Sequence, residues 1–165
     1  MSFYHHYRHL HGFRDTIETF LDAFVSNQIL YAPFNDHILE FWKIRDQPNI
    51  LVLFYEDMKR NLKQEVKKAM KFLNKNYSEE EIDKLCQHLS FESMKNNLSC
   101  NFEDFLEILR TLQSSNGIIP EDGFKFIRKG QIGSHKEELT AEQIKKLNAL
   151  VDDPQLKECG FEYKF

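Results

Sequence analysis

Two adjacent cations precede two glycines in the segment Arg128-Lys129-Gly130-Gln131-Ile132-Gly133. Glycine lets the backbone come close to an anion and point successive N–H groups at it. An arginine can hold phosphate oxygens with a forked contact, and a lysine adds a point charge. The pattern is therefore compatible with a phosphate-binding loop, but a solvated surface turn uses the same residue types.

A second group of candidate residues is the histidine-rich stretch HHYRHLH near the N-terminus, with His5, His6, His9 and His11. On a helix, His5 and His9 share one face, and clustered imidazoles can bind zinc or copper. No cysteine lies nearby, and Asp15 is the one nearby carboxylate that could complete such a site. The stretch therefore favours histidines on a helix surface or interface, and no metal is predicted.

Two further positions could serve a ligand. Phe91, in HLSFESMK, could stack on a nucleobase, or it could simply belong to the core. Tyr55, Glu56 and Asp57 follow the apolar run Ile50–Phe54, which is typical of a buried parallel strand. Ligands of open α/β sheets bind beyond the carboxyl ends of the strands, although these three residues could also cap the next helix.

The composition predicts one globular domain. The chain has 165 residues, of which 41% are hydrophobic and 29% are charged. A formal net charge of −4 argues against a nucleic-acid coat or an anionic membrane surface. No apolar run approaches the ~20 residues of a membrane span. Three widely spaced cysteines without a C-x-x-C pair predict reduced thiols and a cytoplasmic protein.

Helical periodicity dominates the elements that must position these residues. Helices are predicted over residues 2–10, 16–28, 31–45 with a start near Pro33, 62–75, 79–89, 90–97, 102–112 and 141–151. Asp15 is the expected cap of the second, and Ser78-to-Glu81 and Thr140-to-Gln143 form capping boxes. The run Ile50–Phe54 cannot form a parallel sheet alone, because a buried strand needs neighbours for its backbone hydrogen bonds. The expected class is α/β, mostly helical with few parallel strands, with other strands expected upstream.

Several segments together resemble the cytosolic sulfotransferases, which transfer a sulfonate from 3′-phosphoadenylyl sulfate (PAPS) to a hydroxyl or amine. They are VLFYEDMKRN, FLNKNYSEEEIDKLCQHLSFESMKNN and FIRKGQIGSHKEELT in that order, preceded by SFYHHYRH and YAPFNDHILEFW. The resemblance covers essentially all of this chain and about the C-terminal half of a sulfotransferase. It implies that residues 1–165 are the C-terminal portion of one domain with a partial P-loop-type sulfotransferase fold.

The resemblance also implies roles for individual residues. Arg128, Lys129 and Gly130 would hold the 3′-phosphate of PAPS, and Ser2 falls where the family has a serine for the same phosphate. Tyr55 falls at a tyrosine on the nucleotide side of the site, and Phe91 falls at the aromatic residue that packs on the adenine.

This chain departs from the family pattern at three places. Leu89 stands where the family has a threonine near the adenine, and Ser134-His135 replaces the Asp-Trp pair of G-D-W-K. The dimer motif K-x-x-x-T-V-x-x-x-E has a base, Lys145, in place of its final acid. That replacement disfavours the family's kind of homodimer.

The resemblance places the phosphosulfate loop, the catalytic histidine and a further arginine upstream of Met1, so no catalytic residue is assigned here. Met1 is expected to be either an internal methionine or the true start of a shortened paralogue. The predicted function is binding of the 3′-phosphate and adenine side of PAPS, without activity alone, in a family that sulfonates small acceptors such as phenols or alcohols.

Two alternatives stay open. The chain could be a non-catalytic nucleotide- or protein-binding remnant of a sulfotransferase. It could also resemble KH-type RNA-binding domains, whose G-x-x-G loop clamps backbone phosphates, at the position of Gly130 and Gly133. The acidic net charge disfavours that second alternative, so no nucleic-acid polymer and no membrane is expected as a partner.

Overall fold

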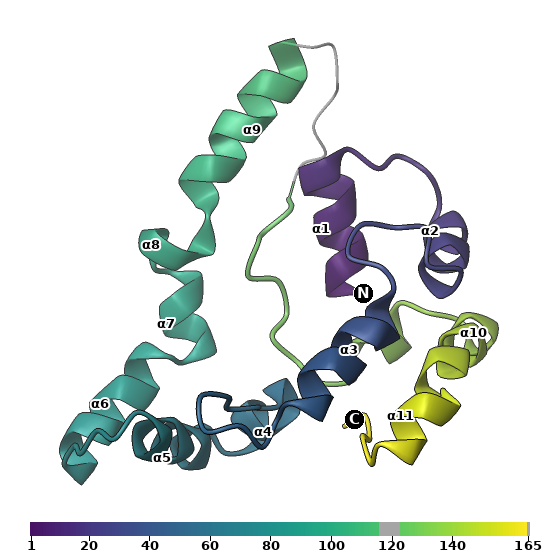
Figure 1. The fold of residues 1–165 in the computed structure, drawn as a ribbon. Helices are drawn as coiled ribbons and strands as arrows, with labels where there is room; N and C mark the ends of the chain where they lie inside the picture. The colour runs from purple at the N-terminus through teal and green to yellow at the C-terminus, as the bar shows by residue number, and fades with distance from the viewer. Residues whose placement is uncertain (116–122, 165) are drawn as a thin grey trace. The chain divides into compact units, whose positions relative to one another are not determined.

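The computed structural model describes residues 1–115 and 123–164, and its regular elements are helices (Figure 1). In chain order they are α1 (Ser2–His11), α2 (Ile17–Val25), α3 (Phe34–Lys43), α4 (Tyr55–Arg60), α5 (Leu62–Phe72), α6 (Glu79–His88), α7 (Phe91–Lys95), α8 (Leu98–Asn101), α9 (Glu103–Ser115), the 3₁₀ helix η1 (Ser134–Glu137), α10 (Ala141–Val151) and α11 (Pro154–Glu158). Among the described residues, no helix has the length and apolar character needed to cross a bilayer.

The chain forms two compact units. Unit 1 combines Met1–Arg14 with Asn76–Gln131, and therefore contains α1 and α6 to α9. Unit 2 combines Asp15–Lys75 with Ile132–Phe165, and contains α2 to α5, η1, α10 and α11. Each unit thus joins segments that are distant in sequence.

Side-chain caps fix where several helices begin. Both predicted capping boxes are confirmed: Ser78 with Glu81 opens α6, and Thr140 with Gln143 opens α10. In each, the hydroxyl of the cap residue accepts a hydrogen bond from the backbone N–H of the residue three positions later. The side chain of that later residue accepts a hydrogen bond from the backbone N–H of the cap residue. The predicted cap Asp15 is wrong, because Thr16 accepts from the Thr19 N–H at 3.2 Å and so caps α2. The Asp15 carboxylate instead accepts from the adjacent Thr16 N–H at 2.7 Å.

The predicted strand over residues 50–54 does not form. Phe54 has extended dihedrals (φ −96°, ψ 135°), but the described part of the chain contains no strand to pair with this segment. Leu51 and Val52 are each 37% exposed, so the segment is also not buried on both faces. A strand requires a neighbour to take its backbone hydrogen bonds, and without one the apolar run stays extended but unpaired. The mostly helical character is confirmed.

The core of unit 2 forms around α3, α11 and the C-terminal residues. Leu39, Leu156 and Phe161 are buried together, with Trp42 and Phe54 among the rings packed against them. Phe41 of α3 is half exposed. Helices α2 and α10 pack side by side, and Lys146 of α10 pairs with both Glu18 and Asp22 of α2.

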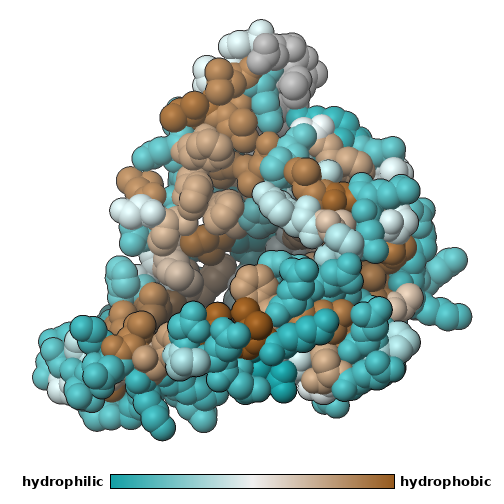
Figure 2. Space-filling view, in the orientation of Figure 1, coloured by the Kyte–Doolittle hydropathy of each residue, from teal (hydrophilic) through white to brown (hydrophobic). Residues whose placement is uncertain are grey.

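Unit 1 buries fewer large side chains and displays an apolar surface. Ile82, Leu106 and Phe124 are buried. Along α8 and α9, Figure 2 shows hydrophobic colour gathered on the surface, where five large side chains are 47–63% exposed: Leu98, Phe102, Phe105, Ile108 and Leu112. The three cysteines of the two units, Cys86, Cys100 and Cys159, are free thiols.

Candidate functional site

Stacked rings hold the backbone that leads into the predicted phosphate loop. The ring of His9 on α1 stacks on Phe124, with 4.2 Å between centroids and 10° between planes. His6, one turn earlier, meets the Phe126 ring edge-on at 4.8 Å. Phe102 also stacks on Phe126, at 4.5 Å and 27°. Aromatic pairs of this geometry add roughly 0.5–1.5 kcal/mol each beyond their burial, so residues 124–126 are fixed immediately before the loop.

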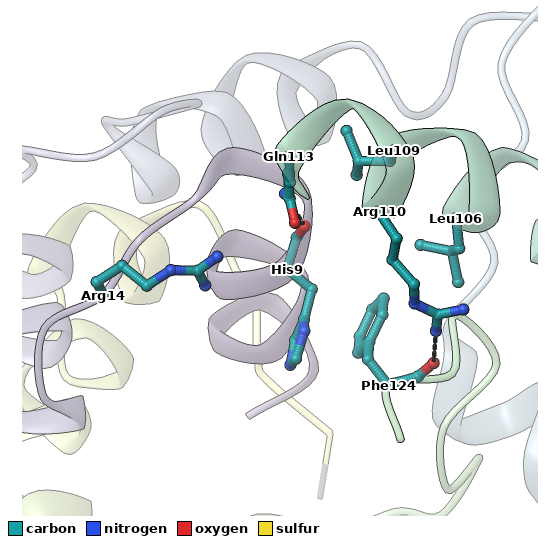
Figure 3. A pocket seen from close by; sticks show the side chains of 7 residues that line it. All are labelled: His9, Arg14, Leu106, Leu109, Arg110, Gln113 and Phe124. Carbon is teal, nitrogen blue, oxygen red and sulfur yellow. Dashed lines mark hydrogen bonds between the residues drawn. The ribbon is translucent and has the colours of Figure 1, made fainter. Parts of the chain in front are cut away.

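Polar contacts hold the same segment against α9. Arg110 donates from Nη2 to the Phe124 carbonyl at 3.2 Å, as Figure 3 shows, and Lys125 pairs with Glu103. Gln113 donates from Nε2 to the His9 carbonyl at 3.3 Å, which ties α9 to α1. The residues drawn in Figure 3 line a cavity of about 10 Å³, room for roughly one water. This cavity therefore lies where α1, α9 and the 124–126 segment meet, and it is too small to hold a nucleotide.

The loop itself is shaped by Gly130. Its φ of 60° lies in the left-handed region, and a Cβ added there would lie 2.2 Å from Cδ2 and 2.4 Å from Cε2 of Phe91. The Gly130 backbone thus lies directly against the Phe91 ring, an approach that a residue with a side chain cannot make. Gly133 has a φ of 76°, but no described heavy atom lies within 4 Å of the corresponding Cβ position.

The two cations of the loop, Arg128 and Lys129, directly precede Gly130 in the sequence. Arg128 is half-buried, and its Nε and Nη2 atoms are buried. Lys129 is half-buried. Phe91, whose ring contacts Gly130, is the first residue of α7. Ser90 caps this helix, because its hydroxyl accepts from the Ser93 N–H at 3.2 Å.

Ser2 is the first residue of α1 and is exposed. Its carbonyl accepts from Nδ1 of His6 at 2.5 Å, and the His6 ring also meets Phe126. The start of α1 is therefore linked through one histidine to the segment before Arg128. Unit 1 holds five of the six predicted site residues: Ser2, Phe91, Arg128, Lys129 and Gly130.

Tyr55, the sixth predicted residue, belongs to unit 2. It is the first residue of α4 and its side chain is 47% exposed. Partial burial raises the pKa of its phenol, and the negative charge of Glu56 adds to the rise. The phenol is therefore neutral and able to donate a hydrogen bond at neutral pH.

Sequence reasoning missed the residues that support the loop. Phe102 and Arg110 received no role, yet Phe102 stacks on Phe126 and Arg110 donates to the Phe124 carbonyl. The alternation of apolar and charged residues in Phe124-Lys125-Phe126 could have indicated that the two rings pack inside unit 1. The histidine stretch was interpreted as a helix surface or interface, and His6 and His9 do pack on rings in unit 1. Among residues 1–115 and 123–164, no group of three His, Cys, Asp or Glu side chains could hold a metal.

Sequence comparison places the chain among known proteins. A family model described as the sulfotransferase domain matches residues 1–160. Luciferin sulfotransferase of Photinus pyralis is 38% identical over 148 residues, which cover 90% of this chain and 39% of the relative. Sulfotransferase 1A1 of Canis lupus familiaris is 32% identical over 166 residues, which cover 99% of this chain and 53% of the relative. The chain therefore belongs to the sulfotransferase family.

Comparison with solved structures supports the same family. Retinol dehydratase in complex with androsterone and the inactive cofactor PAP matches 98% of this chain with a TM-score of 0.85 and 35% identity. A mouse sulfotransferase complexed with PAP matches 96% with a TM-score of 0.71 and 25% identity. The matched parts are 45% and 55% of those two chains. The present chain thus spans about half the length of the relatives it matches.

Proposed function

We propose that this chain forms the part of a sulfotransferase nucleotide site that binds the 3′-phosphate and the adenine of PAPS. The observation that carries the proposal is the close approach of the Gly130 backbone to the Phe91 ring. It brings the predicted phosphate loop and the predicted adenine platform into one contact within unit 1.

The residues at this contact suit the two chemical groups that PAPS offers there. A dianionic phosphate is stabilised by backbone N–H groups at a glycine turn, by the forked donors of Arg128 and by the charge of Lys129. A purine is stabilised by a flat apolar face, such as the ring of Phe91. The related retinol dehydratase and mouse sulfotransferase were both solved with PAP, which carries the same 3′-phosphate and adenine. Bound PAPS would supply the sulfonate.

Nucleotide binding without catalysis is the second part of the proposal. General-base catalysis contributes about 10²- to 10⁴-fold to a rate, and none of the seven histidines matches the family's catalytic position in chain order. His6 and His9 are engaged with phenylalanine rings. We therefore assign no catalytic residue to this chain.

The acceptor is proposed to be a small molecule with a hydroxyl group, such as a phenol or an alcohol. Retinol dehydratase was solved with retinol and with androsterone, and both molecules are alcohols.

Calorimetric titration with adenosine 3′,5′-bisphosphate (PAP) tests the proposal. The Arg128→Ala variant removes charge-assisted hydrogen bonds worth about 1.5–3 kcal/mol each, so its affinity should fall about ten- to hundredfold. Lys84→Ala is the matched control, because Lys84 is exposed and pairs with Glu80 along α6. Its affinity should equal that of the wild type.

Three outcomes would contradict the proposal. They are unchanged affinity in Arg128→Ala, absence of PAP binding by a folded wild-type chain, and preferential binding of single-stranded RNA. Absence of binding would favour the alternative of a non-catalytic, protein-binding remnant, in line with the changed residues Leu89, Ser134 and His135.

A further inference from the structure

Lys164, near the C-terminus, contacts residues on both sides of Tyr55. Its Nζ pairs with the Asp57 carboxylate in the first turn of α4, and it lies 4.2 Å from the centroid of the Phe54 ring. Phe54 is the N-cap of α4, and Asp57 lies two residues after Tyr55. A single ammonium group thus holds the start of α4 by an ion pair and by a cation–π contact.

The C-terminal tail, residues 159–164, is itself firmly attached to unit 2. Trp42 donates from Nε1 to the Cys159 carbonyl at 3.0 Å, and the buried Phe161 ring meets Trp42 edge-on at 5.1 Å. The Tyr163 hydroxyl donates to Oδ1 of Asn35 at 2.7 Å. Lys164 therefore extends from a fixed backbone, so its contacts with α4 can restrain that helix.

Asn35 strengthens this attachment, because it is buried and uses both ends of its amide. Its Nδ2 donates to the Leu150 carbonyl and to the Asp153 carboxylate, each at 2.9 Å. Burial raises the pKa of Tyr163 to about 12, with a further contribution from Asp153. The Tyr163 phenol therefore stays a hydrogen-bond donor throughout the physiological pH range.

The start of α4 needs such a support from outside. Helix α4 has six residues, and helices this short are not stable by themselves. The extended residues before it have no strand partner in the part of the chain that the structure describes. Asp57 also pairs with Arg60 of the same helix, at 3.5 Å. The hydrogen bond from Lys164 is the largest cause that holds the pKa of Asp57 below its ordinary value.

We propose that Lys164 is a positioning residue that sets the orientation of Tyr55 for the nucleotide. The inference rests on the proposed function and on the role on the nucleotide side of the site that the family resemblance implies for Tyr55. Lys164 does not touch the ligand in this account; it acts through the backbone of residues 54–57. The side chain of Tyr55 is partly exposed, and its own packing is therefore weaker than that of a core residue.

The test measures PAP affinity in four chains: wild type, Lys164→Met, Lys164→Arg and Lys157→Met. Methionine keeps the apolar stem of lysine without its charge, whereas arginine keeps the charge. Lys157 is the matched control, because it is an exposed lysine of the preceding helix α11 that pairs with Asp152 at 2.8 Å. Affinity should fall about threefold or more in Lys164→Met, recover in Lys164→Arg and stay unchanged in Lys157→Met.

A double-mutant cycle separates positioning from general stability. In a Tyr55→Phe background, Lys164→Met should cause no further loss of PAP affinity, because the group it positions is already missing. Equal losses in both backgrounds would overturn the inference. So would unchanged affinity in Lys164→Met, even if its melting temperature fell.

Hydrogen exchange at the amides of Met58 and Asn61, which donate to the Phe54 and Asp57 carbonyls, decides the inference independently of the ligand. Faster exchange in Lys164→Met, but not in Lys157→Met, is the expected result, and unchanged exchange would overturn it. If the wild-type chain bound no PAP, the proposed function would fail, whereas the exchange result would still show whether Lys164 restrains the start of α4.

Discussion

Two segments that carry predicted site residues, one in each unit, are held in place by different forces. In unit 1, the segment leading to Gly130 is fixed mainly by ring contacts with His9 and Phe102, and Gly130 itself is fixed by its fit against Phe91. In unit 2, the start of α4 is fixed by the charge of Lys164. The loop of unit 1 should therefore respond to changes of shape, and the start of α4 to changes of charge.

This difference follows from the irregular backbone of both segments. Neither the residues before Gly130 nor those before Tyr55 belong to a strand or a long helix, so regular backbone hydrogen bonding does not fix them. Each must be held by side chains from distant parts of the chain. Ring contacts and glycine fit are short-ranged and insensitive to salt, whereas an exposed ion pair is weakened by salt.

The largest effect is expected in the buried cluster that supports the tail of unit 2. Leu156 is 1% exposed, and Leu156→Ala should lower the free energy of unfolding by about 2–5 kcal/mol, because it leaves a cavity. Leu112→Ala is the control, since Leu112 of α9 is 56% exposed and its truncation should stay within about 0.5 kcal/mol. Urea denaturation measures both. Equal losses would mean that the buried cluster does not dominate stability.

The next largest effect is a difference in PAP affinity between alanine variants of the two loop glycines, Gly130 and Gly133. Gly130 and Gly133 both have positive φ, so alanine at either position strains the backbone by roughly 1–2 kcal/mol. Only alanine at Gly130 would also clash with Phe91. PAP affinity should fall about tenfold or more in Gly130→Ala and much less in Gly133→Ala. Similar losses in the two variants would show that the Phe91 contact does not shape the site.

The smallest effect concerns the ion pairs between α2 and α10 in unit 2. The hydrogen bond from Lys146, followed by one from Gln143, lowers the pKa of Glu18 from its ordinary value of 4.5. A carboxyl with a lowered folded-state pKa stabilises the fold above its ordinary pKa and loses that contribution as the pH falls through the lowered value. Wild type should therefore melt slightly higher than Lys146→Met at pH 7, and the gap should close on acidification below pH 4.5.

Thermal melts at several pH values, at low and at high salt, measure this gap. High salt should reduce it at pH 7, because the partners are exposed. A gap that persists unchanged in acid would assign the effect to packing of the lysine stem and not to its charge.

Local signals in the sequence predicted local structure well. The capping boxes at Ser78 and Thr140 are confirmed, because all their hydrogen bonds lie within three residues. The strand at 50–54 failed for a non-local reason, since an apolar run forms a strand only beside another strand. The predicted N-cap of α2, Asp15, was wrong by one residue, because Asp15 and Thr16 are both residue types that can cap a helix and Thr16 is the one that does.

The candidate site also combines local features that the sequence predicts with long-range contacts that it does not predict. The glycine-rich loop with Arg128 and Lys129 is visible as a pattern in the sequence. The pairing of Lys164 with Asp57 spans 107 residues, and the stack of His9 on Phe124 spans 115, so neither leaves a periodic signal. Long-range contacts depend on which elements fold together, and residue spacing does not encode that. The roles of the six site residues toward PAPS stay a prediction.

The most direct measurement of the central claim compares two nucleotides that differ by one phosphate. PAP and adenosine 5′-monophosphate share the adenine and the 5′-phosphate, so a difference in affinity reports recognition of the 3′-phosphate alone. Calorimetry on the wild-type chain should give an affinity for PAP at least about tenfold higher, and Arg128→Ala should reduce that preference strongly. Equal affinity for the two nucleotides in the wild type would contradict the account.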